Sequence, residues 1–173
     1  FYPAIQPLQS YSEDARPLTA WWQAHGSSDW ARDRERLLAL LERQTRLERL
    51  ARIVGRDALP ADQQLTLLLA AAVAEALLRQ SSFSTVDRWC SPARQSAMLR
   101  LVVRLLDLAA QAVARGVAPA AIARLRVLEH VRRLGEEHGE DDLDGIERLA
   151  RQIETELHGL EAPAAPEERG DAR

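Results

Sequence analysis

The side chains in this sequence that could take part in chemistry are few and scattered. The single cysteine, Cys90, excludes an internal disulfide and a thiolate zinc cluster. Four histidines have no spacing, with one another or with carboxylates, that indicates a metal ligand set. They are His25, His130, His138 and His158. We therefore expect Cys90 to be a buried thiol, the histidines to lie at the surface or at helix ends, and no metal site.

Acidic residues cluster between Glu136 and Asp144, where a calcium loop could be considered. The cluster lacks the alternating ligand positions of such a loop, and it lacks the glutamate at the twelfth position. A solvated turn followed by the acidic first turn of a helix explains the same residues. We adopt this second interpretation.

The sequence contains no lysine, so it has no phosphate-binding loop ending in Gly-Lys-Ser or Gly-Lys-Thr. Its 23 basic residues are all arginines, and they are interspersed with 26 acidic residues for a net charge of -3. This balance does not predict nucleic-acid binding, which requires a basic excess or a basic stripe. We name no catalytic residue in the chain.

Apolar spacing, helix caps and helix breakers predict an all-α fold, a bundle of about six helices. The helices are expected at 17–25, 29–54, 61–80, 92–115, 119–134 and 141–157. A polar loop with Phe83, Trp89 and Cys90 separates the third helix from the fourth. We expect an extended joint at 1–12, one bundle domain at 13–160 and a disordered tail at 161–173.

The second and third helices are predicted to form a long helical hairpin. Gly55 ends the second helix, and Pro60 lies near the first turn of the third. The third helix is apolar on nearly all sides and should be the most buried. Its apolar stretch, Leu65 to Leu78, is shorter than the ~20 residues that cross a bilayer, so we expect no direct membrane insertion.

Several short motifs follow one another in order along the chain. Tyr2-Pro3-Ala4-Ile5 opens it, Ser10-Tyr11-Ser12 follows, and further matches are Ala20 to Trp22, Leu40-Leu41, Ala51 to Pro60, Gln80 to Cys90 and Met98-Leu99. The combination resembles the catalytic A subunit of V-type and archaeal-type rotary ATPases. There, the opening segment joins the nucleotide-binding domain to a C-terminal helical domain. The chain starts at Phe1 without an initiator methionine, and we interpret it as a fragment of a longer protein.

The resemblance implies a role for two aromatic residues, Tyr2 and Phe83. In the family, the aromatic before Pro-Ala-Ile and the phenylalanine after the third helix flank the adenine of the bound nucleotide. Adenine presents a flat face that stacks on aromatic rings, and a stacked base contributes about 1 to 3 kcal/mol. The alternative is that both residues are core aromatics of the bundle.

The turn between the two hairpin helices matches the tip that presses on the central rotor in this family. It consists of Asp57, Ala58, Leu59, Pro60, Ala61 and Asp62, of which only the two aspartates are acidic. Two long helices joined by a tight turn supply a stiff projection without demanding particular side chains. The alternative is an ordinary solvated hairpin loop.

The resemblance implies a parent subunit that binds ATP or ADP with Mg and couples ATP hydrolysis or synthesis to central-stalk rotation and ion transport. Its partners would be the A and B subunits of the hexameric head and the central-stalk subunits, in a cytoplasmic complex peripheral to the membrane. This fragment alone is expected to bind no nucleotide tightly. Two other interpretations remain: a freestanding helical interaction domain, or the C-terminal domain of another rotary or secretion ATPase. Gln6-Pro7, which is closer to the F-type β pattern, keeps the latter open.

Overall fold

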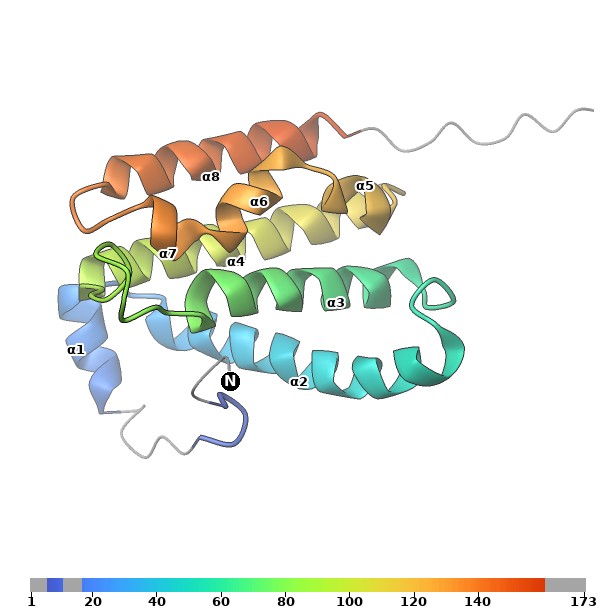
Figure 1. Cartoon of the computed structure of the whole chain (residues 1–173), viewed down its shortest axis with the longest axis horizontal. Helices are drawn as coiled ribbons and strands as arrows, with labels where there is room; N and C mark the ends of the chain where they lie inside the picture. Colours follow the sequence, from blue (N-terminus) through green and yellow to red (C-terminus); the bar gives the residue numbers. More distant parts are fainter. Residues whose placement is uncertain (1–5, 11–16, 161–173) are drawn as a thin grey trace, which may run out of the picture.

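The computed structural model describes residues 6–10 and 17–160 of the 173. These residues form helices, turns and loops, and no strand occurs among them, so the predicted all-α bundle is confirmed. The long helices lie roughly along one direction in Figure 1, and the short helix α1 (Leu18–His25) crosses the end of the bundle. The predicted tail, 161–173, lies outside the described residues, as does most of the predicted joint at 1–12.

The described part of the joint, residues 6–10, is a turn and not the extended segment that the sequence predicts. The N–H groups of Gln9 and Ser10 both donate to the carbonyl of Gln6, at 3.0 and 2.9 Å. The hydroxyl of Ser10 donates to the same oxygen at 2.8 Å. Three donors on one carbonyl close the chain here into a tight turn.

The first helices follow the predicted bounds closely. α1 spans Leu18–His25, α2 spans Trp30–Val54 and α3 spans Ala61–Val73. α2 and α3 lie side by side as the predicted hairpin (Figure 1). Trp22 of α1 stacks on Trp30 of α2, with ring centroids 5.0 Å apart, and this pair fixes the short helix to the long one.

The end of the third predicted helix differs from the expectation. A π-helical segment, Ala74–Leu78, follows α3 directly and replaces the α-helix predicted to run to Gln80. Its last hydrogen bond joins the N–H of Arg79 to the carbonyl of Ala74, at 2.9 Å. Such segments are rare and occur frequently at functional sites. Here the segment leads the chain into the loop that contains Phe83.

The second half of the bundle is α4 (Pro92–Ala114), three short helices and α8 (Leu143–His158). The short helices, α5 (Pro119–Ala123), α6 (Arg126–Arg132) and α7 (Leu134–Glu137), replace the single helix predicted at 119–134. Leu125 breaks it with an extended backbone, φ -63° and ψ 133°. The N–H of Val127 then donates to Glu156 Oε2 of α8 at 3.3 Å. A partner distant in sequence therefore stabilises the break.

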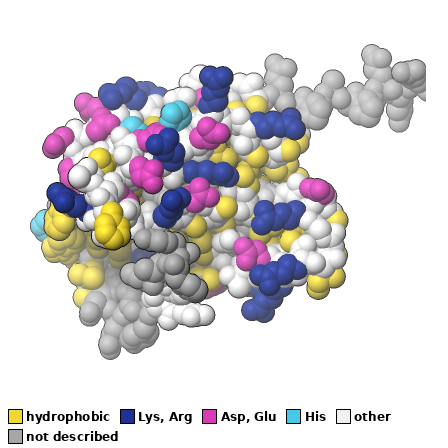
Figure 2. All heavy atoms as spheres, viewed as in Figure 1, with side chains coloured by type: hydrophobic (Ala, Val, Ile, Leu, Met, Phe, Trp, Pro, Cys, Tyr) yellow, Lys and Arg dark blue, Asp and Glu magenta, His cyan; other side chains and the backbone are white. Residues whose placement is uncertain are grey.

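The core lies between α3, α4 and α8. α4 packs along α8 on one side and against α2 and α3 on the other. The sequence places apolar residues at three- and four-residue spacing along this last helix, at Leu143, Ile146, Leu149, Ile153 and Leu157. All of them are buried except Leu143, which is 37% exposed. Burial of such side chains contributes about 1.5 to 3 kcal/mol each. On the surface, Figure 2 shows arginines interspersed with acidic side chains.

Within the described residues, one segment is long and apolar enough to cross a membrane by length and composition alone. It is Ala61–Leu78, which comprises α3 and the π-helical segment. This segment packs between α2 and α4, and Ala70, Ala72 and Val73 within it are almost completely buried. Its apolar surface faces the protein core.

Candidate functional site

The loop between the π-helical segment and α4, residues 79–91, contains the predicted base-contacting residue Phe83. The Phe83 side chain is 93% exposed, so the structure excludes the alternative of a core aromatic for this residue. Tyr2, its predicted partner, lies outside the described residues. The structure therefore places one member of the predicted pair on an open surface and does not describe the other.

The loop is held internally by Asp87 and Ser84. Asp87 is buried, and its Oδ2 accepts the backbone N–H of Ser81 at 2.7 Å, while its carbonyl accepts from Gln80 Nε2 at 2.7 Å. The hydroxyl of Ser84 accepts the N–H groups of Val86 and Asp87 at 3.2 and 3.1 Å. These bonds close the loop around Phe83 into a defined turn.

Arg94, in the first turn of α4, bonds to the loop through its side chain. Its side chain is completely buried. Nη1 donates to the carbonyl oxygens of Val86 at 3.1 Å and Trp89 at 2.6 Å, and Nη2 donates to the carbonyl of Gly135 at 2.8 Å. One guanidinium group therefore joins the loop to α7.

Glu140 completes this arrangement. Its Oε1 accepts the N–H of Ser91 at 2.9 Å and lies 3.4 Å from Arg94 Nη1. Partial burial alone would raise the pKa of Glu140, but the hydrogen bonds from Ser91 and the charge of Arg94 outweigh it and lower the pKa. Glu140 lies in the predicted turn and is partly exposed, and it has the further role, not predicted from the sequence, of balancing a buried arginine.

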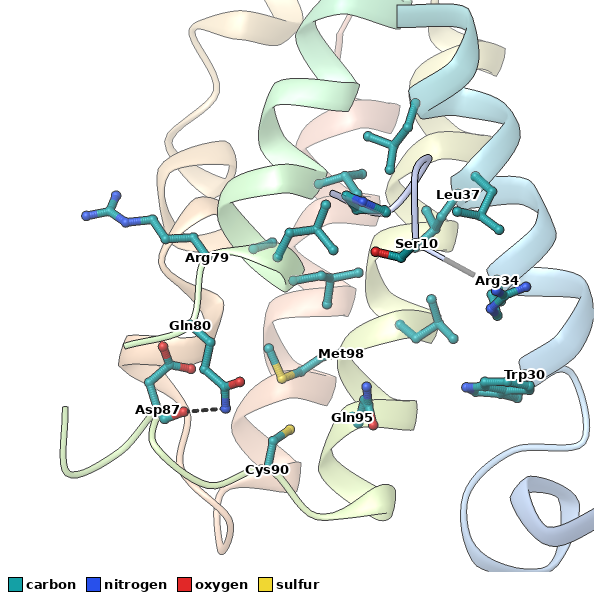
Figure 3. Close-up of a pocket in the computed structure, with 18 residues that line it drawn as sticks. Ser10, Trp30, Arg34, Leu37, Arg79, Gln80, Asp87, Cys90, Gln95 and Met98 are labelled. Atoms are coloured by element: carbon teal, nitrogen blue, oxygen red, sulfur yellow. Dashed lines mark hydrogen bonds between the residues drawn. The ribbon is translucent and has the colours of Figure 1, made fainter. Parts of the chain in front are cut away.

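A cavity of about 370 Å³ lies beside this loop, between α2, the π-helical segment and α4. Pro7 and Ser10 of the opening turn also line it. Figure 3 shows Met98 and Cys90 near each other at one end, the side chain of Gln80 bonded to Asp87, and Arg79 pointing away. Cys90 is half-buried, and burial raises the pKa of its thiol.

The predicted rotor-contact turn lies at the opposite end of α3 from the loop (Figure 1). Five of its residues are exposed, namely Asp57, Ala58, Pro60, Ala61 and Asp62. Leu59 is buried against Leu47 and Leu67. Gln64 Nε2 donates to the carbonyl oxygens of Leu59 at 2.7 Å and Asp57 at 3.3 Å. The turn is thus anchored by one apolar and two polar contacts.

Apolar side chains are exposed on α2 just before this turn. Leu50, Ile53 and Val54 are 42%, 83% and 48% exposed. They occur at three- and four-residue spacing, so they share one face at the end of the helix. Neighbouring exposed apolar residues of this kind are typical of protein contact surfaces.

His138 and Asp142 form a structural pair before α8. His138 Nδ1 lies 2.7 Å from Asp142 Oδ2, and Asp142 Oδ1 accepts the N–H of Gly145 at the start of α8. The hydrogen bond from His138 lowers the pKa of Asp142. In the part of the chain that the structure describes, no three His, Cys, Asp or Glu side chains gather to hold a metal ion.

Comparison with known proteins assigns this chain to a family. Residues 19–122 match the family model described as the C-terminal domain of V and A type ATP synthase. The chain belongs to this family. The matched range runs from α1 to α5 and includes both the hairpin turn and the Phe83 loop of this C-terminal domain.

Curated relatives agree with the family model. The A subunit of the A-type ATP synthase of Methanopyrus kandleri is 31% identical over 159 residues, which are 92% of this chain and 27% of that protein. The corresponding subunit of Pyrococcus horikoshii is 36% identical over 133 residues, 77% of this chain and 14% of that protein. The chain thus spans about a quarter or less of the length of these relatives. The predicted resemblance is confirmed.

Sequence reasoning missed Arg94, Asp87 and Gly135 as the residues that support the Phe83 loop. One signal was available for Arg94. Ser91 caps α4, accepting the N–H of Arg94 at 3.2 Å, and Pro92 follows it, so Arg94 occupies the third helical position. Acidic residues are favoured there, and an arginine opposes the helix dipole. A cation at this position indicates that acceptors elsewhere in the fold hold it.

Proposed function

We propose that this chain is the C-terminal helical domain of the catalytic subunit of a V/A-type rotary ATPase. In this proposal it contributes the base-side edge of the nucleotide site and the projection that contacts the central stalk. The observation that carries the proposal is the almost complete exposure of Phe83 on a loop that is fixed by buried polar contacts. An exposed aromatic ring on a fixed support suits a ligand or a partner.

The nucleotide role rests on stacking. ATP or ADP, with Mg, would bind mainly to the part of the full-length subunit that precedes this domain, and the adenine would lie between Tyr2 and Phe83. The ring of Phe83 is free to form such a contact, because it packs against almost nothing within the described residues. The domain would grip the base and perform no step of phosphate chemistry.

The mechanical role rests on the hairpin. α3 and the π-helical segment form a continuous stretch from the hairpin turn to the Phe83 loop. At 1.5 Å per residue, this stretch is on the order of 25 Å long. Turn residues Asp57 to Asp62 and the apolar face of Leu50, Ile53 and Val54 would touch a central-stalk subunit. The complex would hold A and B subunits in a hexameric, peripheral, cytoplasmic head whose activity is coupled to ion transport.

The test is Phe83→Ala in the assembled complex that contains the full-length subunit. Loss of a stacked base contact of about 1 to 3 kcal/mol should raise KM or Kd for ATP roughly 5- to 150-fold, with the fold retained. Phe83→Tyr keeps the ring and should stay near the wild type. Ser82→Ala, at the exposed neighbouring position, is the matched control. Unchanged ATP affinity in Phe83→Ala would refute the base contact.

A further inference from the structure

We propose that Arg94 is a positioning residue for the nucleotide base: it fixes the loop of Phe83 and so sets affinity for the base without touching it. The inference rests on the proposed function of Phe83. It assigns a role in nucleotide affinity to a side chain in the first turn of α4 that donates hydrogen bonds to the Phe83 loop. Its physical basis is the set of acceptors that one buried guanidinium group joins.

The loop around Phe83 is anchored on both sides at short range. On the preceding side, Asp87 Oδ2 accepts the N–H of Ser81, two residues before Phe83. On the following side, Arg94 Nη1 donates to the carbonyl of Val86, three residues after it. Only four residues separate these two anchors, so the position of the exposed ring follows the position of the anchors.

Arg94 also ties the loop to a second part of the fold. Nη2 donates to the carbonyl of Gly135 in α7, and Glu140 lies within ion-pair distance of Nη1. Gly135 further permits the close approach of Asp87, because a Cβ added there would lie 2.6 Å from Asp87 Oδ1. Asp87 and Arg94 therefore both contact α7 at Gly135. Arg94 in addition donates hydrogen bonds to both the loop and α7.

The arginine fork is required for this geometry. Three backbone carbonyls from two segments accept from its two terminal nitrogens, which a single ammonium group cannot reach together. The side chain is completely buried, so its donor groups have no water to bond to in place of these carbonyls. Replacement by lysine should retain the charge and part of the bonding, whereas methionine should lose both.

The experiment uses the full-length subunit in its assembled complex, with Arg94→Met, Arg94→Lys, Phe83→Ala and the double variant Phe83→Ala/Arg94→Met. Arg94→Met should raise KM for ATP at least about fivefold with kcat within about twofold, because the base contact is lost and the phosphate chemistry is intact. Arg94→Lys should fall between Arg94→Met and the wild type. In the Phe83→Ala background, Arg94→Met should change KM by less than about twofold.

A second measurement reports the loop directly. Amide hydrogen exchange of residues 80–91 should rise in Arg94→Met, while that of α8 stays unchanged. Arg100→Met, an exposed arginine on the same helix, is the matched control and should change neither exchange nor KM. If the Arg94→Met subunit does not assemble, Glu140→Gln is used in its place. It weakens the ion pair of the partly exposed Glu140 with Arg94, and it should also raise KM and the amide exchange of the loop.

The outcomes separate the two claims. A raised KM in Phe83→Ala together with a wild-type KM in Arg94→Met, or in Glu140→Gln where that variant is used, overturns the positioning role and leaves the proposed function intact. A wild-type KM in Phe83→Ala refutes the proposed base contact itself. A loss of kcat with unchanged KM in Arg94→Met, or fully additive effects in the double variant, also overturns the inference, because Arg94 then acts independently of the ring.

Discussion

Gly135→Ala is the substitution whose effect the structure defines most closely. A Cβ at this position would lie 2.6 Å from Asp87 Oδ1 and 3.3 Å from Asp87 Cγ, whereas ordinary contact begins at about 3.4 Å. Asp87 is buried and its other oxygen accepts the N–H of Ser81, so the carboxylate cannot withdraw without straining that bond. The methyl group therefore acts on the loop through one identifiable hydrogen bond.

Two opposing effects set the magnitude. Weakening a hydrogen bond to a buried carboxylate costs about 1.5 to 3 kcal/mol, and replacing a helical glycine by alanine returns about 0.5 to 1 kcal/mol. The midpoints of these two ranges leave a net loss of about 1.5 kcal/mol in the free energy of unfolding. For a chain of this length, each kcal/mol lowers Tm by about 2 to 4 °C.

Thermal unfolding of the purified chain, followed by circular dichroism, measures this loss. Gly139→Ala is the matched control, since a Cβ there would meet only Val86 Cγ1 at an ordinary 3.7 Å. Its Tm should stay within about 1 to 2 °C of the wild type, as for surface changes in general. If Gly135→Ala were as stable as Gly139→Ala, the packing of Asp87 against α7 would not constrain the loop.

Two further perturbations test the same framework. The contacts of Glu140 lower its pKa in the folded state. Ionised Glu140 therefore stabilises the fold above its unfolded pKa of about 4.3, and this stabilisation is lost as the pH falls below that value. Glu140→Gln should thus be less stable than the wild type at pH 7, and the gap in Tm should shrink towards pH 3; a constant gap would contradict the assignment. Gly55→Ala should lower the free energy of unfolding, measured in urea, by about 1 to 3 kcal/mol. Gly55 has φ 85° and ψ 151°, where alanine is strained, and an added Cβ would find no atom within 4 Å, so no new contact offsets the strain.

The sequence predicts best those features that depend on near neighbours along the chain. Gly55 ends α2 and Pro92 opens α4 as expected, because caps and breakers act within one helical turn. Four of the five apolar residues spaced along α8 are buried, since a three- and four-residue period requires only that some apolar partner exists, whereas Leu143 at its first position is 37% exposed. Family membership was also predictable, from motifs that lie in order along most of the chain.

Features that depend on distant partners were not predictable in the same way. The break between α5 and α6 is stabilised by Glu156, about thirty residues further along the chain. The Phe83 loop depends on Gly135 and Glu140, which lie more than forty residues beyond the arginine that binds them. Local propensity describes neither contact, because each residue taken alone fits an ordinary helix end or a solvated turn.

The two most exposed large apolar side chains of the described residues are Phe83 and Ile53, at 93% and 83%. They lie near opposite ends of α3: Phe83 is in the loop that Arg94 and Asp87 hold, and Ile53 is in the last turn of α2, before the hairpin turn that Gln64 holds. A flexible loop could fold such a side chain back onto the core and so remove apolar area from water. The hydrogen bonds of the Phe83 loop oppose that collapse, and the helical backbone of α2 does the same for Ile53, so this domain maintains exposed apolar side chains near both ends of α3. Surfaces kept open in this way are explained by partners that cover them, a base at one end and the central stalk at the other in the function proposed above.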